Sequence, residues 1–366
     1  MGDRPNPLAR LLAPAHRASV TFRHTSLDPL LEPMTWTVLS HPPDTLVVLG
    51  LALAIEAAAG YPDRLYRALG HPVTWIGRAI GGLEGALNTG GEGRRRAAGT
   101  VGLLVLLVTV GSVSIGATAL AATAGPLPAL LLLGLACASL PAQRSLHDHV
   151  SRVASALRAE GLAGGRREVS MIVGRNPESL DEAGICRAAI ESLSENFSDG
   201  IVAPAFWIGI GGLPGGALYK AINTADSMIG HRTPRHNAYG WASARLDDLV
   251  NLPASRLSAV LIVAASLLHP GASAAGACRA VRRDAGKHRS PNAGWPEAAM
   301  AGALGLRLAG PRRYGTEFVD DGWMGDGRAE AGPRDVERAL ALYRIACALL
   351  FGLVTLGALI LKVVLI

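Results

Sequence analysis

The chain has 366 residues, of which 49% are hydrophobic and 17% are charged, and its formal net charge is +6. Soluble proteins carry charges at about a quarter of their positions, so this composition argues against an ordinary soluble enzyme. The positive charge lies in arginine-rich loops without interleaved aromatic residues, which argues against nucleic acid as a partner. The composition predicts an all-α, polytopic integral membrane protein in a lipid bilayer, with helical cytoplasmic loops.

The first 43 residues differ from the rest of the chain. They are rich in Pro, Arg and Ser and lack the continuous apolar core of a secretory signal. We expect residues 1–43 to form a disordered N-terminal extension. Residues 44–366 are then expected to form a single membrane domain.

The longest uncharged stretch lies between Arg96 and Arg144 and is interrupted by Gly125-Pro126-Leu127-Pro128. Because a spanning helix needs about 20 apolar residues, the stretch predicts a transmembrane hairpin of residues 100–122 and 127–143. Residues 345–366 predict another span. The flanking arginine-rich loops are expected on the cytoplasmic side, namely residues 61–99, 144–200 and 279–344.

Three further apolar segments are less regular: residues 46–60, 201–219 and 257–276. Residues 201–219 are rich in glycine and contain Pro204 and Pro214. Irregular backbone at membrane depth is tolerated where it is buried in protein, so this segment is as consistent with a buried or re-entrant element as with a straight crossing.

The loop after Arg144 predicts two helices. Apolar residues at helical spacing predict the first over residues 145–161, ending at Gly161. The second is expected to open at Asn176-Pro177, with acidic residues in its first turns where the helix dipole favours them. Four widely spaced cysteines without a CxxC pair are expected to be unpaired, buried hydrophobes: Cys137, Cys186, Cys278 and Cys347.

Residues 194–207, SENFSDGIVAPAFW, place Glu195 and Asp199 four positions apart at the end of the second helix. Acidic groups there oppose the helix dipole, so a cation or a magnesium-bound phosphate would compensate them. The alternative is a solvated helix end at the membrane surface.

A second polar cluster follows the glycine-rich segment. A helix over residues 217–228 would place Lys220, Asn223 and Ser227 on one face. Carboxylate and amide oxygens suit magnesium, and Lys and Arg suit phosphate, so the cluster predicts a phosphate-plus-magnesium site, with surface salt bridges as the alternative. Its members are Lys220, Asn223, Asp226, His231, Arg232, Arg235, Arg245, Asp247, Asp248 and Asn251.

Two tempting motifs fail. The stretch GIGGLPGGALYK lacks the spacing and the Ser or Thr of a Walker loop. His147 and His149 stand two apart and cannot share a helical face as a metal pair.

Several long strings together resemble adenosylcobinamide-phosphate synthase, the CobD/CbiB family of cobalamin biosynthesis. The resemblance covers nearly everything from about Thr45 onward. It rests on IVGR, LDEAGICRAAIESLSENFSDGIVAPAFW, GGLPGGALYKAINTADSMIGHRTPR and GWASARLDDLVN between residues 172 and 251, on HPVTWIGRAIGGLE at 71–84, and on NAGWPEAAMAGALGLRLAGPRRYG at 292–315. The chain departs from the family pattern in its first apolar segment, where Glu56 replaces an expected Asp.

The resemblance implies a multi-pass enzyme of the cell (inner) membrane with its active site facing the cytoplasm. It would join a corrinoid, adenosylcobyric acid, to (R)-1-amino-2-propanol phosphate or aminopropanol in an ATP- and Mg²⁺-dependent amide bond, through an acyl phosphate. Other cobalamin-pathway enzymes are plausible partners. A corrinoid transporter and a non-catalytic membrane sensor or scaffold remain the alternatives.

The resemblance also suggests roles for the polar residues. The expected catalytic groups are Glu195, Asp199, Asp226, Asp248 and His231. The expected magnesium ligands are Glu195, Asp199, Asp247 and Asp248. The expected substrate- and phosphate-binding residues are Lys220, Arg232, Arg235, Arg245, Asn196, Asn223 and Asn251. A crossing by residues 201–219 would separate Glu195 from Lys220, and one site could not hold both. We therefore expect that residues 201–219 and 257–276 do not both cross, and that at least the first is re-entrant or packed inside the helical body.

Overall fold

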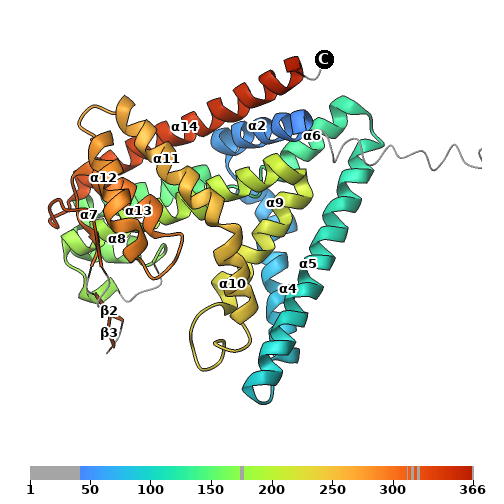
Figure 1. Cartoon of the computed structure of the whole chain (residues 1–366), viewed down its shortest axis with the longest axis horizontal. Coiled ribbons are helices and arrows are strands. Elements are labelled where there is room, and N and C mark those ends of the chain that lie inside the picture. Colours follow the sequence, from blue (N-terminus) through green and yellow to red (C-terminus); the bar gives the residue numbers. More distant parts are fainter. Residues whose placement is uncertain (1–41, 174–176, 311, 315–316, 320–321, 365–366) are drawn as a thin grey trace, which may run out of the picture. The chain divides into compact units, whose positions relative to one another are not determined.

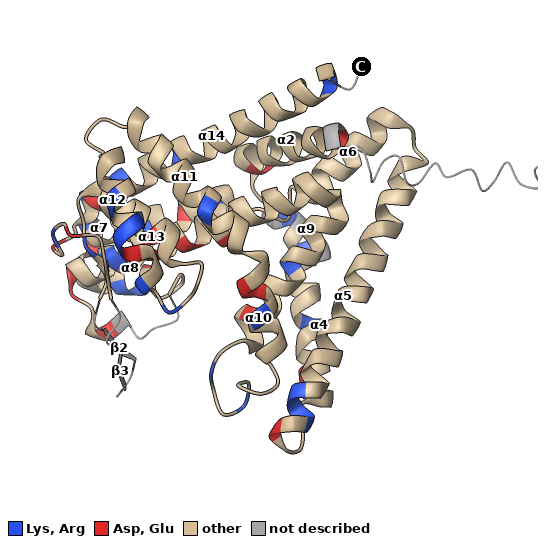
Figure 2. Ribbon diagram, viewed as in Figure 1, with Lys and Arg blue, Asp and Glu red and all other residues tan. Residues whose placement is uncertain are grey.

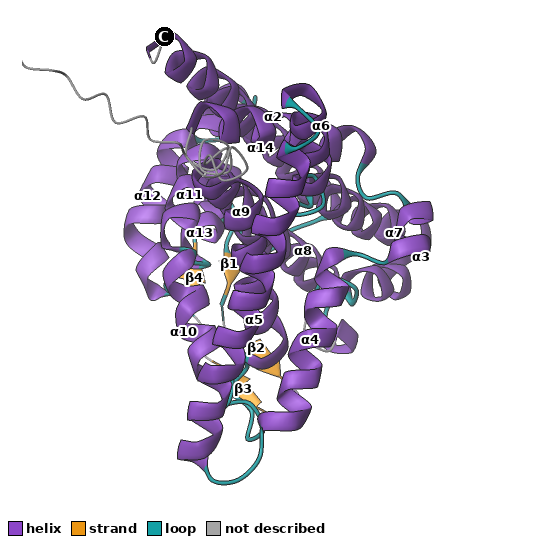
Figure 3. Cartoon of the chain, turned by 90° about the vertical axis from the view of Figure 1, so that its right-hand side faces the viewer, coloured by secondary structure: helices purple, strands orange, loops and turns teal. Residues whose placement is uncertain are grey.

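The computed structural model describes residues 42–173, 177–310, 312–314, 317–319 and 322–364. Most of the expected N-terminal extension lies outside these residues. The all-α prediction is confirmed, because the strands within the described residues are short (Figure 3). These strands are β1 (Leu308–Ala309), β2 (Arg312–Tyr314), β3 (Glu317–Val319) and β4 (Trp323–Met324), paired antiparallel as β1 with β4 and β2 with β3.

The helices account for nearly all of the described chain (Figure 1). In chain order they are α2 (Pro42–Ala59), α3 (Asp63–Leu69), α4 (Pro72–Leu87), α5 (Glu92–Ala122), α6 (Pro126–Cys137), α7 (Gln143–Val169), α8 (Glu182–Phe197), α9 (Ala203–Ile229), α10 (Trp241–Val250), α11 (Leu252–Leu268), α12 (Ala274–Asp284), α13 (Gly294–Leu304) and α14 (Pro333–Val364). Short 3₁₀ turns occupy Pro177–Ser179 and Ala285–Lys287, and a π-helix, Ser198–Val202, joins α8 to α9.

The long helices α5 and α14 confirm two of the expected spans. Both are long and apolar enough to cross a membrane, and side chains such as Val108, Leu120 and Leu359 are more than 60% exposed. Charged residues are sparse along most of α5 and the second half of α14 (Figure 2). By length and composition the described residues contain three candidate crossings, or four if α10 and α11, bent by 44°, form one. The protein is therefore an all-α membrane protein.

The second arm of the expected hairpin, residues 127–143, is shorter than expected. The helix α6 ends at Cys137 after 12 residues. That length covers only about 18 Å, less than the roughly 30 Å of the hydrocarbon core. The chain then passes through Pro141 and begins α7 at Gln143. The prediction of two full spans here was wrong: one long helix and one short helix pack together.

Two other boundaries also differ from expectation. Residues 257–276 do not form one segment, because α11 ends at Leu268 and α12 starts at Ala274. The helix expected to open at Asn176-Pro177 begins instead at Glu182, where the side chain of Asp181 accepts a hydrogen bond from the Gly184 amide at 2.7 Å. The helix expected to end at Gly161 does break there, and a further helical stretch continues to Val169.

The glycine-rich segment reverses direction inside α9. Gly211 and Gly212 have non-helical dihedral angles, and Gly212 has φ of 58° and ψ of −147°, a combination that favours glycine. The stretches of α9 before and after these glycines form the two arms of a hairpin. The arms approach so closely that a Cβ on Gly215 would lie 2.3 Å from the carbonyl oxygen of Trp207. Thr45 Oγ1 donates to the carbonyl oxygen of Gly209 at 2.6 Å, which satisfies a backbone acceptor near the turn. Residues 201–219 are thus a re-entrant hairpin, as predicted.

The buried Glu56 links α2 to the start of α7. Its Oε1 accepts the backbone amide hydrogen of Arg144 at 3.0 Å, and its Oε2 accepts from Gln143 Nε2 at 3.2 Å. The first amides of a helix lack intrahelical partners, and a carboxylate there also favours the helix dipole. Glu56 is only 3% exposed, so its observed contacts assign it a structural role in anchoring α7.

Candidate functional site

The ends of the hairpin meet at one point. The hydroxyl of Tyr219 lies 2.8 Å from the carbonyl oxygen of Asp199 and 2.9 Å from Asn251 Oδ1. Its single hydrogen satisfies one of these acceptors at a time. The contact joins the π-helix before α9, the second arm of α9, and the junction of α10 with α11. Residues from three separate stretches of sequence are thereby brought together.

Asp247 lies at the centre of an acid and amide network. Its Oδ2 accepts from Asn251 Nδ2 at 2.9 Å, and its Oδ1 accepts from Asn223 Nδ2 at 3.3 Å. Asp247 is 9% exposed and Asn251 is 1% exposed. A buried carboxylate needs such donors, because burial without hydrogen bonds costs several kcal/mol. Asp247 and Asn251 are four positions apart, so one helical turn brings their side chains together.

Further carboxylates surround this network. The charges of Asp247, Glu195 and Asp226 all act on Asp199, and Lys220 is near enough for its charge to act on Asp199 as well. Like charges held this close repel one another, and a bound proton or a nearby cation offsets that repulsion. Lys220 supplies one positive charge, so the acids outnumber the lysine at this point.

A second group of charges lies beside the first. Arg245 Nη1 is 3.6 Å from Asp248 Oδ2, and the charge of Arg232 also acts on Asp248. His231 acts on Asp226 in the same way. Arg232, Arg245 and His231 are exposed, so their side chains can reach a ligand without losing a buried contact.

A cavity of about 600 Å³ opens next to the network. Lys220, Asn223 and Ser227 line it from α9, which confirms that these three share one face. Asn196 lines it from α8, and His149 lines it from α7. Its wall is mixed, with about as much polar as apolar character, and a cavity of this volume accepts a sizeable part of a large ligand.

One predicted residue, Arg235, is engaged outside the cluster. Arg235 donates from Nε and Nη2 to the two carboxylate oxygens of Glu84, both at 2.7 Å. This bidentate contact lowers the pKa of Glu84 from 4.5 to about 2, with Asn88 adding a further hydrogen bond. Two nitrogens of Arg235 are therefore committed to a structural ion pair. Glu195 and Asn196 are exposed at the end of α8, where Asn196 Nδ2 donates to the carbonyl oxygen of Ser192 at 2.9 Å.

The sequence analysis missed a second layer of residues around the cluster. Asn292 Nδ2 donates to the carbonyl oxygen of Asp248 at 2.8 Å, and Asn292 Oδ1 accepts from Arg256 Nη1 at 2.8 Å. The string containing Asn292 was recognised, but no periodicity links it to residues 44 positions away. His71, at the start of α4, lies near Lys220; burial, and then the charge of Lys220, lower the pKa of His71. Tyr219 was missed because it ends an apolar run.

The donor set can be compared with the needs of a magnesium ion. Within the described ranges, no three His, Cys, Asp or Glu side chains are arranged as a closed metal site. Magnesium bound with a nucleotide retains waters and phosphate oxygens and needs only one or two carboxylates. Asp199, Asp247 and Asp248 supply carboxylates of that kind, with amides nearby. The residues present therefore fit a nucleotide-bound Mg²⁺.

The fold and the site define a class: an all-helical membrane protein that folds a re-entrant hairpin to assemble an acid, amide and lysine cluster beside a large cavity. The chain belongs to the CobD/Cbib protein family, whose model matches residues 49–343. Over 311 residues it is 52% identical to "Cobalamin biosynthesis protein CobD" of Rhizobium meliloti (strain 1021). The aligned region covers 84% of this chain and 95% of the relative.

Two more relatives carry the same name. The Rhodobacter capsulatus protein is 51% identical over 309 residues, covering 83% of this chain and 95% of the relative. The Brucella suis biovar 1 protein is 47% identical over 322 residues, covering 86% of this chain and 97% of the relative. No solved structure matches the chain. The matches span both the hairpin and the residues that form the cluster.

Proposed function

We propose that this protein acts in cobalamin biosynthesis as an ATP-dependent ligase. It joins the carboxylate of adenosylcobyric acid to the amine of (R)-1-amino-2-propanol phosphate, or of free aminopropanol, in an amide bond. The name of the relatives supports the pathway. One structural observation carries the chemistry: the hairpin gathers Asp199, Lys220 and Asp247 beside one large cavity.

The reaction must overcome the poor leaving group of a carboxylate. In the proposed sequence, a corrinoid carboxylate oxygen attacks the γ-phosphorus of ATP, the bond to ADP breaks, and an acyl phosphate forms. The amine nitrogen then attacks the acyl carbon, the carbon–oxygen bond to phosphate breaks, and the nitrogen loses a proton. Phosphate is a much better leaving group than oxide, which is why the first step makes the second feasible.

The chain's own residues have distinct tasks in this sequence. Lys220, Arg232 and Arg245 bind phosphate oxygens of the nucleotide or of the amine. Asp226 or Asp248, with His231 nearby, accepts the proton that the amine loses. Asn196, Asn223 and Asn251 orient the acids and the substrate. Mg²⁺ held at Asp199, Asp247, Asp248 and Glu195 would neutralise phosphate charge when bound.

The location of the site follows from its substrates. ATP is available in the cytoplasm, so we propose that the cluster faces the cytoplasm from a bacterial inner membrane. The corrinoid would lie in the cavity against the apolar residues Ile201 and Leu146 while its reacting carboxylate reaches the cluster. Other enzymes of the pathway could deliver the corrinoid or receive the product there.

The test uses the purified full chain in detergent, supplied with adenosylcobyric acid, aminopropanol phosphate, Mg²⁺ and ATP. The new amide is followed by mass spectrometry, with free aminopropanol in a parallel reaction. We expect ATP-dependent product that is lost in Asp248→Asn and Lys220→Met. Lys362→Met, at the far end of α14, is the matched control and should retain activity.

Two outcomes would replace the proposal. Corrinoid binding without amide formation from either amine would favour a transporter or a sensor. Full activity in both Asp248→Asn and Lys220→Met would move the reaction away from this cluster. A topology reporter placed after Tyr239 provides a further check, because a periplasmic signal would contradict a cytoplasmic site.

A further inference from the structure

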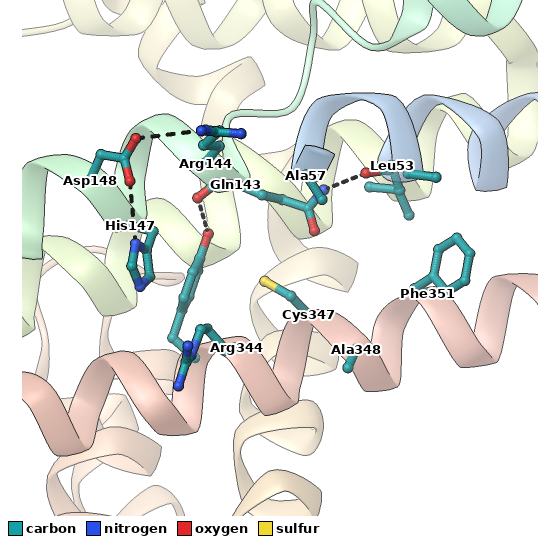
Figure 4. A pocket seen from close by; sticks show the side chains of 12 residues that line it. Leu53, Ala57, Gln143, Arg144, His147, Asp148, Arg344, Cys347, Ala348 and Phe351 are labelled. Atoms are coloured by element: carbon teal, nitrogen blue, oxygen red, sulfur yellow. Dashed lines mark hydrogen bonds and ion pairs between the residues drawn. The ribbon is translucent and has the colours of Figure 1, made fainter. Parts of the chain in front are cut away.

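A second cavity of about 600 Å³ lies between α2, α7 and α14, lined by none of the residues assigned above to the ligase site (Figure 4). Leu53 and Ala57 line it from α2, and Phe351 lines it from α14. Arg144 and His147 line it from the first turns of α7. The proposed reaction uses none of these residues, so this cavity is separate from the ligase site.

The cavity has a cationic end and an apolar end. Arg144, His147 and Arg344 line the cationic end, and Asp148, which also lines it, lies 3.9 Å from Arg144 Nε and 3.4 Å from His147 Nδ1. Leu53, Ala57 and Phe351 make up the apolar end. Asp148 lies beside Arg144, and Glu56 accepts from the Arg144 backbone amide. Arg344 has no such acidic partner among the described residues, which suits an anion joined to an apolar tail.

Arg344 is the most available of these cations. It is exposed, and among the described residues it has no hydrogen-bond or ion-pair partner (Figure 4). Arg144, in contrast, lies near Asp148 and also donates to the carbonyl oxygen of Ala58. A guanidinium without a protein partner next to an apolar cavity is free to bind a phosphate through two of its N–H groups.

The position of Arg344 along α14 fixes the depth of this cation. The first three turns carry five charged residues, of which Arg344 is the last, and from Ile345 to Leu361 the helix carries no charge. Arginines at such a boundary lie at the level of the lipid headgroups. Phe351 lies two turns further along and is 41% exposed. Apolar side chains beyond it, such as Leu353 and Leu356, are also exposed. The cavity thus runs from headgroup level toward the acyl chains.

We propose that this cavity binds an anionic phospholipid. The lipid phosphate lies between Arg344 and Arg144, and one acyl chain runs along Leu53, Ala57 and Phe351. Charge and apolar length are both needed to fill the site, which favours a lipid over free phosphate. The inference does not depend on the proposed ligase activity.

The test measures lipid binding to the full chain in neutral detergent by native mass spectrometry. Phosphatidylglycerol should bind at least about fivefold more tightly to the natural protein than to Arg344→Gln, as expected for loss of one arginine at an anionic headgroup. Arg344→Lys keeps the charge and should recover most of the affinity. Arg334→Gln is the matched control, because Arg334 is an exposed arginine on the same helix outside the cavity.

A second arm separates a lipid from other occupants. Phosphatidylcholine with the same acyl chains should bind more weakly, millimolar inorganic phosphate should not displace phosphatidylglycerol, and Phe351→Asn should weaken binding. Equal affinity in Arg344→Gln and Arg334→Gln would overturn the proposal. Displacement by inorganic phosphate would make this a simple anion site, and competitive displacement by adenosylcobyric acid would assign it to the corrinoid; either result also overturns the lipid assignment.

Discussion

The Tyr219 hydroxyl lies 2.8 Å from the carbonyl oxygen of Asp199, although twenty positions separate the two residues. A straight helix would hold them about 30 Å apart. The contact therefore exists only because the chain reverses at Gly211 and Gly212. The first prediction concerns that reversal.

Replacing Gly215 with Ala should destabilise the protein, because the new Cβ would lie 2.3 Å from the carbonyl oxygen of Trp207 and the two arms would have to separate. Overpacking of this kind costs about 1–3 kcal/mol. Gly211→Ala is the matched control, since a Cβ there meets nothing within 4 Å and should change stability by less than about 0.5 kcal/mol. Thermal unfolding in detergent compares the two. Equal midpoints would mean that the arms are not packed as described.

Asp247→Asn should reduce kcat by about 10- to 100-fold, in the range seen when a group that orients ligands is lost. One of its oxygens would become an NH₂ group facing the amide of Asn223 or Asn251, so a donor would face a donor. Asp326→Asn, a change at an exposed acid paired with Arg283, should leave kcat unchanged. The amide-forming assay measures both variants, and unaltered kcat in Asp247→Asn would exclude Asp247 from the reaction.

The ion pair of Arg235 with Glu84 should make stability depend on pH. The pKa of Glu84 is about 2 in the folded protein and ordinarily 4.5, so the pair stabilises the fold above about pH 4.5. This contribution is lost as the pH falls toward 2. Arg235→Gln should therefore lower the Tm by a few degrees at pH 7, and the difference from the natural protein should shrink below pH 4.5.

The same variant tests the sequence-based role of Arg235. If Arg235 acts only through Glu84, Arg235→Gln leaves the KM for ATP and for the amine unchanged, and Glu84→Gln produces a similar loss of stability. A rise in either KM with little change in Tm would instead support phosphate binding by Arg235.

Glu56→Ala should destabilise the protein by about 1–3 kcal/mol, because the amide of Arg144 and the side chain of Gln143 lose their acceptor in a buried setting. Glu56→Gln keeps one acceptor oxygen and should lose less. Thermal unfolding ranks the three proteins. Glu56→Ala with full stability and no activity would point to a catalytic role in place of the structural one.

Sequence reasoning predicted the spans of α5 and α14 because long uncharged runs have one dominant physical meaning in a bilayer. It also predicted the shared face of Lys220, Asn223 and Ser227, because helical periodicity is local. The end of α6 was missed, since it depends on how Pro141 leads into a helix anchored by Glu56 across the fold. The contacts of Asn292, Arg256 and Tyr219 were missed for the same reason: they join residues that only tertiary structure brings together.

The hairpin also changes the number of membrane crossings from odd to even or from even to odd. By length and apolar character alone, Glu182–Ile229 would count as a crossing. Because the chain turns back at Gly212, this segment enters and leaves on the same side and contributes no crossing. A topology drawn from hydrophobic segments alone would then assign every loop after Ile229 to the opposite compartment. It would place Lys220 and Arg245 on the other side of the membrane from Glu195 and Asp199.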